Sequence, residues 1–390
     1  MLGRIKKRKV LIYIFLIFIL VFLFLMYKNQ NSNYDKIEIE DNINNYLSLN
    51  DSSNALIQNK YSDDPFEKAM ELKYPKDINF VPAYLNDQNY LFGEIDLSND
   101  RTDIGIGSYN LEKNEFRILE KIHMKSKYAS IGIVIATDKA VIYEETDQQN
   151  GVSDFYLYDL TLKKSIKLHS IKEIPPIHYS NADSNNFGIM LNFYTKDGYN
   201  NYFYSYDNKE LVKIENENCG FPVYCNNLWY YVLIDNKKKT TELIEFDMIN
   251  SNKRVLYKTV EKNNYISGVY SNGIELFLLM QNGEFKDIYE VDLKNKTMNI
   301  KFKDSWIESL VLNQNFMSWL GKNELPDRKR PQFHFINLNE FSTVSNEDGK
   351  IFLSNNGIAK INYKKSDVEI PKGKIYMNDN SSIYFKKLRR

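Results

Sequence analysis

The residue types that most often perform catalysis or bind metals are scarce in this chain. Its 390 residues include two cysteines and four histidines, which are Cys219, Cys225, His123, His169, His178 and His334. Zinc sites and cysteine or histidine catalysis draw on these side chains. No G-x-S-x-G elbow, H-E-x-x-H pair or phosphate-binding glycine loop occurs. We therefore predict no catalytic residue, no resident metal and no cofactor.

One loop carries a pattern that could bind a ligand. Asp327, Arg328, Lys329 and Arg330 lie together between two prolines. A rigid loop of this kind could hold a carboxylate or phosphate, because arginine makes bidentate contacts with both. The alternative interpretation is a solvated hairpin tip.

Aspartates and cysteines offer two further kinds of site. Asp96, Asp100 and Asp103 could supply oxygen ligands to calcium, but they do not match the twelve-residue calcium loop. Cys219 and Cys225 could form a small disulfide outside the cell. Six extended residues span about 20 Å, so a bridge needs a turn between the two cysteines. The alternative is a pair of small buried thiols.

The N-terminus predicts a membrane anchor. Five basic residues within positions 4–9 precede an uninterrupted apolar run from Val10 to Met26. A helix of this length rises about 26 Å, which is at the short end of what spans a bilayer. No small residues follow to form a cleavage site. We expect residues 1–9 to be a cytoplasmic tail and 10–27 an uncleaved signal anchor, with the rest outside a bacterial cell.

Two short regions precede the main domain. Residues 28–63 are rich in Asn, Asp and Ser, which predicts a flexible extracytoplasmic stalk. Asp64-Pro65-Phe66-Glu67 has the pattern of a capping box with a first-turn proline. This pattern predicts a short helix within residues 64–74, either docked on the edge of the domain or part of the stalk.

A repeat organises the remaining residues, 75–390. Its clearest copy is Phe155–Leu168, where a strand ends in Tyr-Asp and a short turn leads to a second strand. The same Asp or Asn marker recurs at positions 110, 159, 207, 247, 292 and 337, with spacings of 49, 48, 40, 45 and 45. A period of about 40 to 50 residues with several strands per unit is typical of a β-propeller.

Each unit contains four predicted strands. Nearly continuous apolar runs such as Phe187–Tyr194 and Leu228–Ile234 precede the markers, as expected for strands buried on both faces. The chain is therefore predicted to be all-β, a propeller of four-stranded blades. We count seven, while six or eight remain open because terminal units exchange strands. The 51 basic and 51 acidic residues cancel, so no nucleic-acid partner is expected.

The Tyr-Asp-Leu-x-x-x-Lys copies resemble the blades of TolB-like and related bacterial β-propellers over about residues 78–390. The resemblance implies that the first strand of each blade lines a central channel. It also implies that the loops between second and third strands share a face with the inter-blade connections. These loops are long and variable, so we expect ligands there.

Function follows only in outline from these patterns, because a fold alone does not define an activity. We expect a membrane-anchored module that binds or scaffolds a protein, peptide or envelope polymer. One alternative is a glycan-acting hydrolase or lyase with acidic residues in the funnel. Another is an accessory subunit of a membrane complex, although the span lacks small residues for close helix packing.

Overall fold

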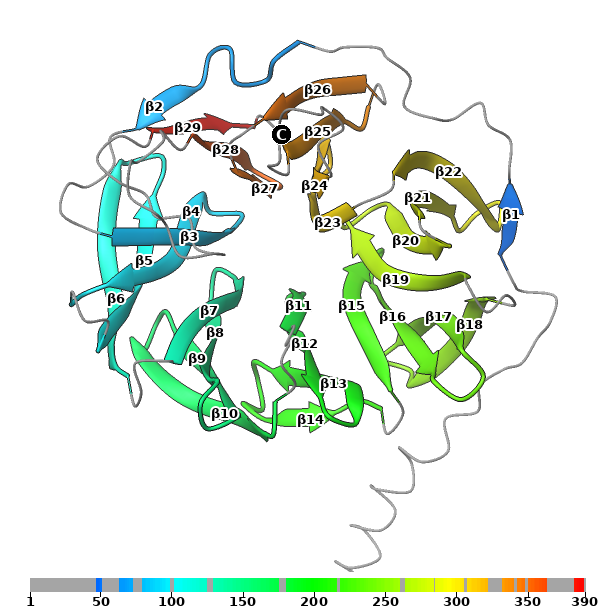
Figure 1. The fold of residues 1–390 in the computed structure, drawn as a ribbon, viewed down its shortest axis with the longest axis horizontal. Helices are drawn as coiled ribbons and strands as arrows, with labels where there is room; N and C mark the ends of the chain where they lie inside the picture. The colour runs from blue at the N-terminus through cyan, green and yellow to red at the C-terminus, as the bar shows by residue number, and fades with distance from the viewer. Residues whose placement is uncertain are drawn as a thin grey trace, which may run out of the picture.

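The computed structural model describes residues 47–50, 63–72, 79–98, 102–124, 129–174, 180–215, 218–259, 264–283, 285–304, 307–321, 332–339, 342–347, 350–362 and 382–388. These residues form seven separate β-sheets and no helix. Figure 1 shows the sheets arranged as the blades of a ring. Residues of all seven blades line a hollow at its centre, the central channel. The predicted seven-bladed propeller is confirmed.

The first four blades are antiparallel meanders that run outward from the channel. Blade 1 contains β3 (Asn79–Leu85), β4 (Tyr90–Asp96), β5 (Asp103–Asn110) and β6 (Glu115–His123). Blade 2 contains β7 (Ala129–Ala136), β8 (Ala140–Asp147), β9 (Val152–Asp159) and β10 (Lys164–Lys172). Blade 3 contains β11 (Ser180–Ser184), β12 (Gly188–Thr195), β13 (Gly198–Ser205) and β14 (Leu211–Lys213). Blade 4 contains β15 (Cys219–Cys225), β16 (Leu228–Asp235), β17 (Thr240–Asp247) and β18 (Asn252–Lys258).

The last three blades follow the same path, and two of them add a strand from the N-terminal region. Blade 5 contains β19 (Asn264–Ser271), β20 (Leu276–Asn282), β21 (Phe285–Asp292), β22 (Thr297–Asp304) and the added β1 (Ser48–Asn50). Blade 6 contains β23 (Ile307–Leu312), β24 (Phe316–Gly321), β25 (Gln332–Asn337) and β26 (Ser342–Glu347). Blade 7 contains β27 (Lys350–Ser354), β28 (Gly357–Asn362), β29 (Ser382–Lys387) and the added β2 (Met70–Leu72).

The core lies between the blades rather than in one central mass. Seven buried apolar clusters occur, one at each boundary between neighbouring blades. The second strands supply most of it, because they are covered on both faces, as in the run of buried residues along β12. Trp229 and Trp319 are 1% and 0% exposed, which confirms that these tryptophans pack in the core.

The marker residues cap the turn after the third strand of a blade. Asp159 accepts hydrogen bonds from the backbone N–H groups of Thr161 and Leu162, at 2.8 and 2.9 Å. In blade 3 the sequence pattern places the marker at Asp207, two residues after the end of β13. Ser205 rather than Asp207 ends β13, pairs with Gly188 and caps the turn through Oγ. A serine hydroxyl caps a turn in the same way as Asp or Asn, but the marker pattern includes only Asp and Asn.

The ring is closed by a strand that the sequence predicted as helix. Asp64 does cap a turn, since its Oδ1 accepts the N–H of Phe66 at 2.9 Å. The turn covers only residues 65–68, and β2 then pairs antiparallel with β29. Phe66 and Leu72 are 8% and 3% exposed in the clusters that flank blade 7. A strand at this place buries both side chains and pairs the edge of β29 that would otherwise be free. The propeller therefore begins before residue 75.

Part of the predicted stalk is docked on the propeller. β1 runs parallel to β22, and Leu47 is 5% exposed in the cluster between blades 4 and 5. The rest of residues 28–62 and the predicted anchor, 10–27, lie outside the described residues. No helix in the described part of the chain is long and apolar enough to cross a membrane.

Candidate functional site

Polar turns surround one mouth of the central channel. They connect the first and second strands of the blades. In six blades the first strand is followed by a residue whose side chain accepts backbone N–H groups of its own turn, namely Asn86, Thr137, Asn185, Asn272, Asn313 and Ser354. Such self-capping fixes the turn without help from neighbouring elements.

Hydrogen bonds also join these turns to the next blade. Contacts cross six of the seven blade boundaries among the described residues. At the boundary between blades 7 and 1, both carboxylate oxygens of Asp87 are engaged by Asn355, through the backbone N–H at 2.8 Å and the side-chain amide at 3.0 Å. Between blades 3 and 4, Asp183 accepts the N–H of Tyr224 at 2.7 Å. The mouth is therefore a preformed ring rather than a set of independent loops.

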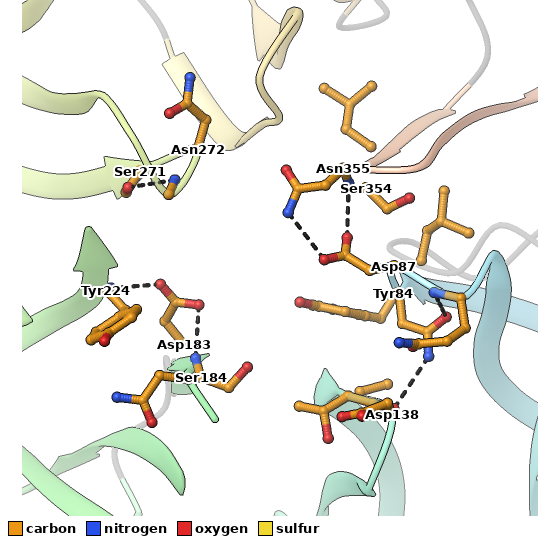
Figure 2. Close-up of a pocket in the computed structure, with 18 of the residues that line it drawn as sticks. Tyr84, Asp87, Asp138, Asp183, Ser184, Tyr224, Ser271, Asn272, Ser354 and Asn355 are labelled. Atoms are coloured by element: carbon orange, nitrogen blue, oxygen red, sulfur yellow. Dashed lines mark hydrogen bonds between the residues drawn. The ribbon is translucent and has the colours of Figure 1, made fainter. Parts of the chain in front are cut away.

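The turns enclose a cavity of about 400 Å³. It contains three carboxylates, Asp87, Asp138 and Asp183, which come from blades 1, 2 and 3. Figure 2 shows Asp87 facing Asn355 and Asp183 beside Tyr224, with the ring of Tyr84 directed into the space between the two aspartates. The other wall residues are mainly Asn, Ser, Thr and Gln, and among the described residues no lysine, arginine or histidine lines the cavity.

Electrostatics in the mouth disfavour additional negative charge. Tyr84 and Asp183 keep a partly exposed surface but lie deep among protein atoms. Burial, and to a smaller extent the charge of Asp87, raise the pKa of Asp183 to about 6, although the N–H groups of Tyr224 and Ser184 oppose the shift. Burial, followed by the charges of Asp183 and Asp87, raises the pKa of the Tyr84 phenol. A cation placed here would relieve this repulsion.

Lys139 follows the mouth residue Asp138 but lies beside the mouth. Lys139 donates to the carbonyl of Asn186 at 3.2 Å and lies 4.5 Å from the centre of the Tyr206 ring. These contacts hold its ammonium group on the side of the turn. The cavity itself keeps an acidic lining.

The described residues contain no group of three or more His, Cys, Asp or Glu side chains arranged to hold a metal ion. Of the aspartates considered for calcium, Asp103 has another partner, and so do two aspartates of blade 2. Asp103 contacts His123 at 2.8 Å, Asp147 caps its own turn, and Asp154 pairs with Lys167 at 2.8 Å. The arrangement in the mouth is thus suited to recognising a positively charged organic group.

The ligand-binding loop predicted from the sequence cannot be compared with this site, because Asp327, Arg328, Lys329 and Arg330 lie outside the described residues. Cys219 and Cys225 are both buried free thiols at the two ends of β15. The segment between the cysteines is a strand and not the tight turn that a bridge requires, so the structure has the second of the two arrangements considered, a pair of buried thiols.

The acidic mouth is not among the sites predicted from the sequence, although a signal for it is present. Short polar pairs follow most of the first strands, such as Asn86-Asp87, Thr137-Asp138 and Asn355-Asn356. Each pair reads as an ordinary turn. Their convergence follows only from the closed ring, which brings residues from both ends of the domain to one mouth.

Comparison with solved structures supports the fold. The chain is similar to TolB from Acinetobacter baumannii, with 12% identity and a TM-score of 0.44 over 68% of this chain and 62% of that one. It is also similar to an oligogalacturonate lyase in complex with manganese, with 12% identity and a TM-score of 0.52 over 84% and 95% of the two chains. The β-propeller domain of the Trilobed protease from Pyrococcus furiosus gives 12% identity and a TM-score of 0.52 over 73% and 91%.

These comparisons place the chain among β-propeller proteins and define no activity, because identities this low show the fold alone. TolB is among the similar structures, as the resemblance of the repeats predicted. The chain spans less than two thirds of the TolB structure. No protein-family profile and no curated protein sequence matches it.

Proposed function

We propose that this protein is a membrane-anchored, extracytoplasmic binding module. Its channel mouth would receive a positively charged group of a protein, peptide or envelope polymer. The observation that carries the proposal is the cavity lined by three aspartates and, within the part of the chain that the structure describes, by no cationic side chain. Its volume lies within the range of about 300–1,000 Å³ that is usual for small-molecule sites.

The contacts of two aspartates in the mouth favour binding over catalysis. Asp87 is engaged at both oxygens by Asn355, and Asp183 accepts one backbone N–H at each oxygen. Donors of this kind hold a carboxylate in a fixed orientation, which suits recognition of a cation. A glycan-acting hydrolase or lyase would need a carboxyl group free to exchange protons with its substrate. The lyase among the similar structures shares only the fold.

The anchor is proposed from residues 10–27 alone. We expect the intact protein to sediment with membranes, and a chain that starts at residue 28 to remain in the supernatant. High-salt and carbonate washes would separate an inserted chain from a peripheral one. Release of the intact chain by these washes would contradict the anchor and leave the mouth unaffected.

The location of the site can be tested by hydrogen exchange on the full chain in detergent. We expect the probe peptide acetyl-Lys-Gly-Gly-Phe to protect amides in the turns near residues 86–89 and 137–139, because binding restricts their opening. The matched peptide acetyl-Glu-Gly-Gly-Phe should protect neither. Protection of the opposite turns, near residues 148–151 and 236–239, would instead support the face predicted from the sequence.

A further inference from the structure

A second hollow of about 480 Å³ lies between blades 1 and 2. Its wall includes residues of the second and outermost strands of blade 1 and of the third strand and following turn of blade 2. We call it the inter-blade groove.

The groove and the mouth are continuous. Four residues line both: Asn86, Gln88, Thr137 and Asp138. They belong to the first turns of blades 1 and 2. A ligand held in the mouth can therefore pass over Asp138 into the groove without leaving the surface.

The groove differs from the mouth in chemistry. Phe92 and Tyr158 are 2% and 4% exposed and form a fixed apolar floor, and Tyr90 lies beside Phe92 with ring centres 6.2 Å apart. Ile118 is 41% exposed on β6 and borders the groove. An exposed aliphatic side chain next to a rigid aromatic floor is suited to receive an apolar side chain.

Charge changes sign along this path. The inner end carries Asp87, Asp138 and Asp183, whereas the outer strand and turn carry Arg117 and Lys163. Arg117 contacts Glu115 at 3.1 Å, but both side chains are well exposed, at 68% and 49%. An exposed ion pair of this kind is weak and exchanges readily for another carboxylate.

We propose that the inter-blade groove is a second subsite, in which an extended peptide continues from the mouth. Its basic side chain lies in the mouth, a following apolar side chain lies on Phe92, Tyr158 and Ile118, and its carboxylate faces Arg117 and Lys163. This inference rests on the proposed function of the mouth. A peptide is favoured over an envelope glycan because it alone combines an amine, a bulky apolar group and a carboxylate in that order.

The test compares three probes on the full chain in detergent: cadaverine, acetyl-Lys-Gly-Gly-Phe and acetyl-Lys-Gly-Gly-Ala. We expect the phenylalanine peptide to bind about tenfold more tightly than the alanine peptide, since burial of an aromatic ring is worth more than that of a methyl group. Amidation of the C-terminus should reduce this affinity by about threefold.

A variant of the groove provides the second arm. Ile118→Asp should remove most of the advantage of the phenylalanine peptide and leave cadaverine binding unchanged. Ile166→Asp is the matched control, because Ile166 is 39% exposed on the outermost strand of blade 2 and does not line the groove. That variant should bind all three probes as the parent chain does.

The outcomes separate the two proposals. Equal affinity for the phenylalanine and alanine peptides, with cadaverine still bound, would overturn the groove alone. Loss of binding by all three probes in the parent chain would overturn the mouth as well. Displacement of the phenylalanine peptide by a glucosamine oligomer that is insensitive to Ile118→Asp would also contradict a peptide subsite.

Discussion

Replacement of Leu72 with aspartate should destabilise the protein more than any other single change discussed, by about 3–5 kcal/mol. Leu72 is 3% exposed between blades 7 and 1, among residues that include Phe385 and Ile383. β2 pairs with β29 over only three residues, so it has few backbone contacts to compensate. A buried carboxylate without a partner at this position should release β2 and open the ring.

Thermal unfolding of the full chain measures this effect. A loss of this size should lower the melting temperature by roughly 6 °C or more. Glu71→Ala is the control, because Glu71 is exposed on the same strand and its replacement should cost less than about 0.5 kcal/mol. Identical melting of the Leu72→Asp variant and the parent chain would show that β2 does not close the propeller.

The second large effect concerns the mouth. Asp138→Asn combined with Asp183→Asn should weaken binding of cadaverine by about 100-fold, because each charge-assisted contact contributes about 1.5 kcal/mol and each 1.4 kcal/mol is tenfold in affinity. The folded state should tolerate both changes. Asp138 is exposed, and an asparagine at position 183 retains one oxygen to accept a backbone N–H.

The same binding should depend on pH in a defined direction. The pKa of Asp183 is raised to about 6 by burial, so the carboxylate is protonated below this value and ionised above it. The amine stays protonated throughout, so affinity for cadaverine should rise severalfold from about pH 5 to about pH 7.5. The double variant should lose this dependence. An affinity that falls as pH rises would contradict the role of Asp183.

A matched variant checks that charge alone is not responsible. Asp197→Asn with Asp235→Asn removes the same number of charges from turns after the second strands, away from the mouth. Binding of cadaverine to this variant should equal that of the parent chain within about twofold, because exposed charges beyond the Debye length are screened.

The blades could be predicted from the sequence because their determinants are local. The second strands are largely apolar, as along β12, and residues such as Asp159 cap their own turn. The repeat remains recognisable in blade 3, where Ser205 takes the place of Asp or Asn as the capping residue. Local patterning of this kind needs no knowledge of distant residues.

Ring closure could not be predicted in detail because it joins distant segments. The sequence correctly predicts the cap at Asp64. Whether the following residues form a helix or a strand depends on the edge of β29, more than 300 residues away. The acidic mouth has the same origin, since the contact between Asp87 and Asn355 spans 268 residues. Because the loops between the second and third strands are long, the sequence predicts a ligand site on the opposite face.

The claim that the mouth binds a positively charged group is tested most directly by a calorimetric titration of cadaverine into the full chain in detergent near neutral pH, with the matching uncharged diol as control. We expect one saturable site for cadaverine, weakened by added salt, and no binding of the diol. Equal binding of both molecules, or binding of neither, would contradict a cation-binding mouth.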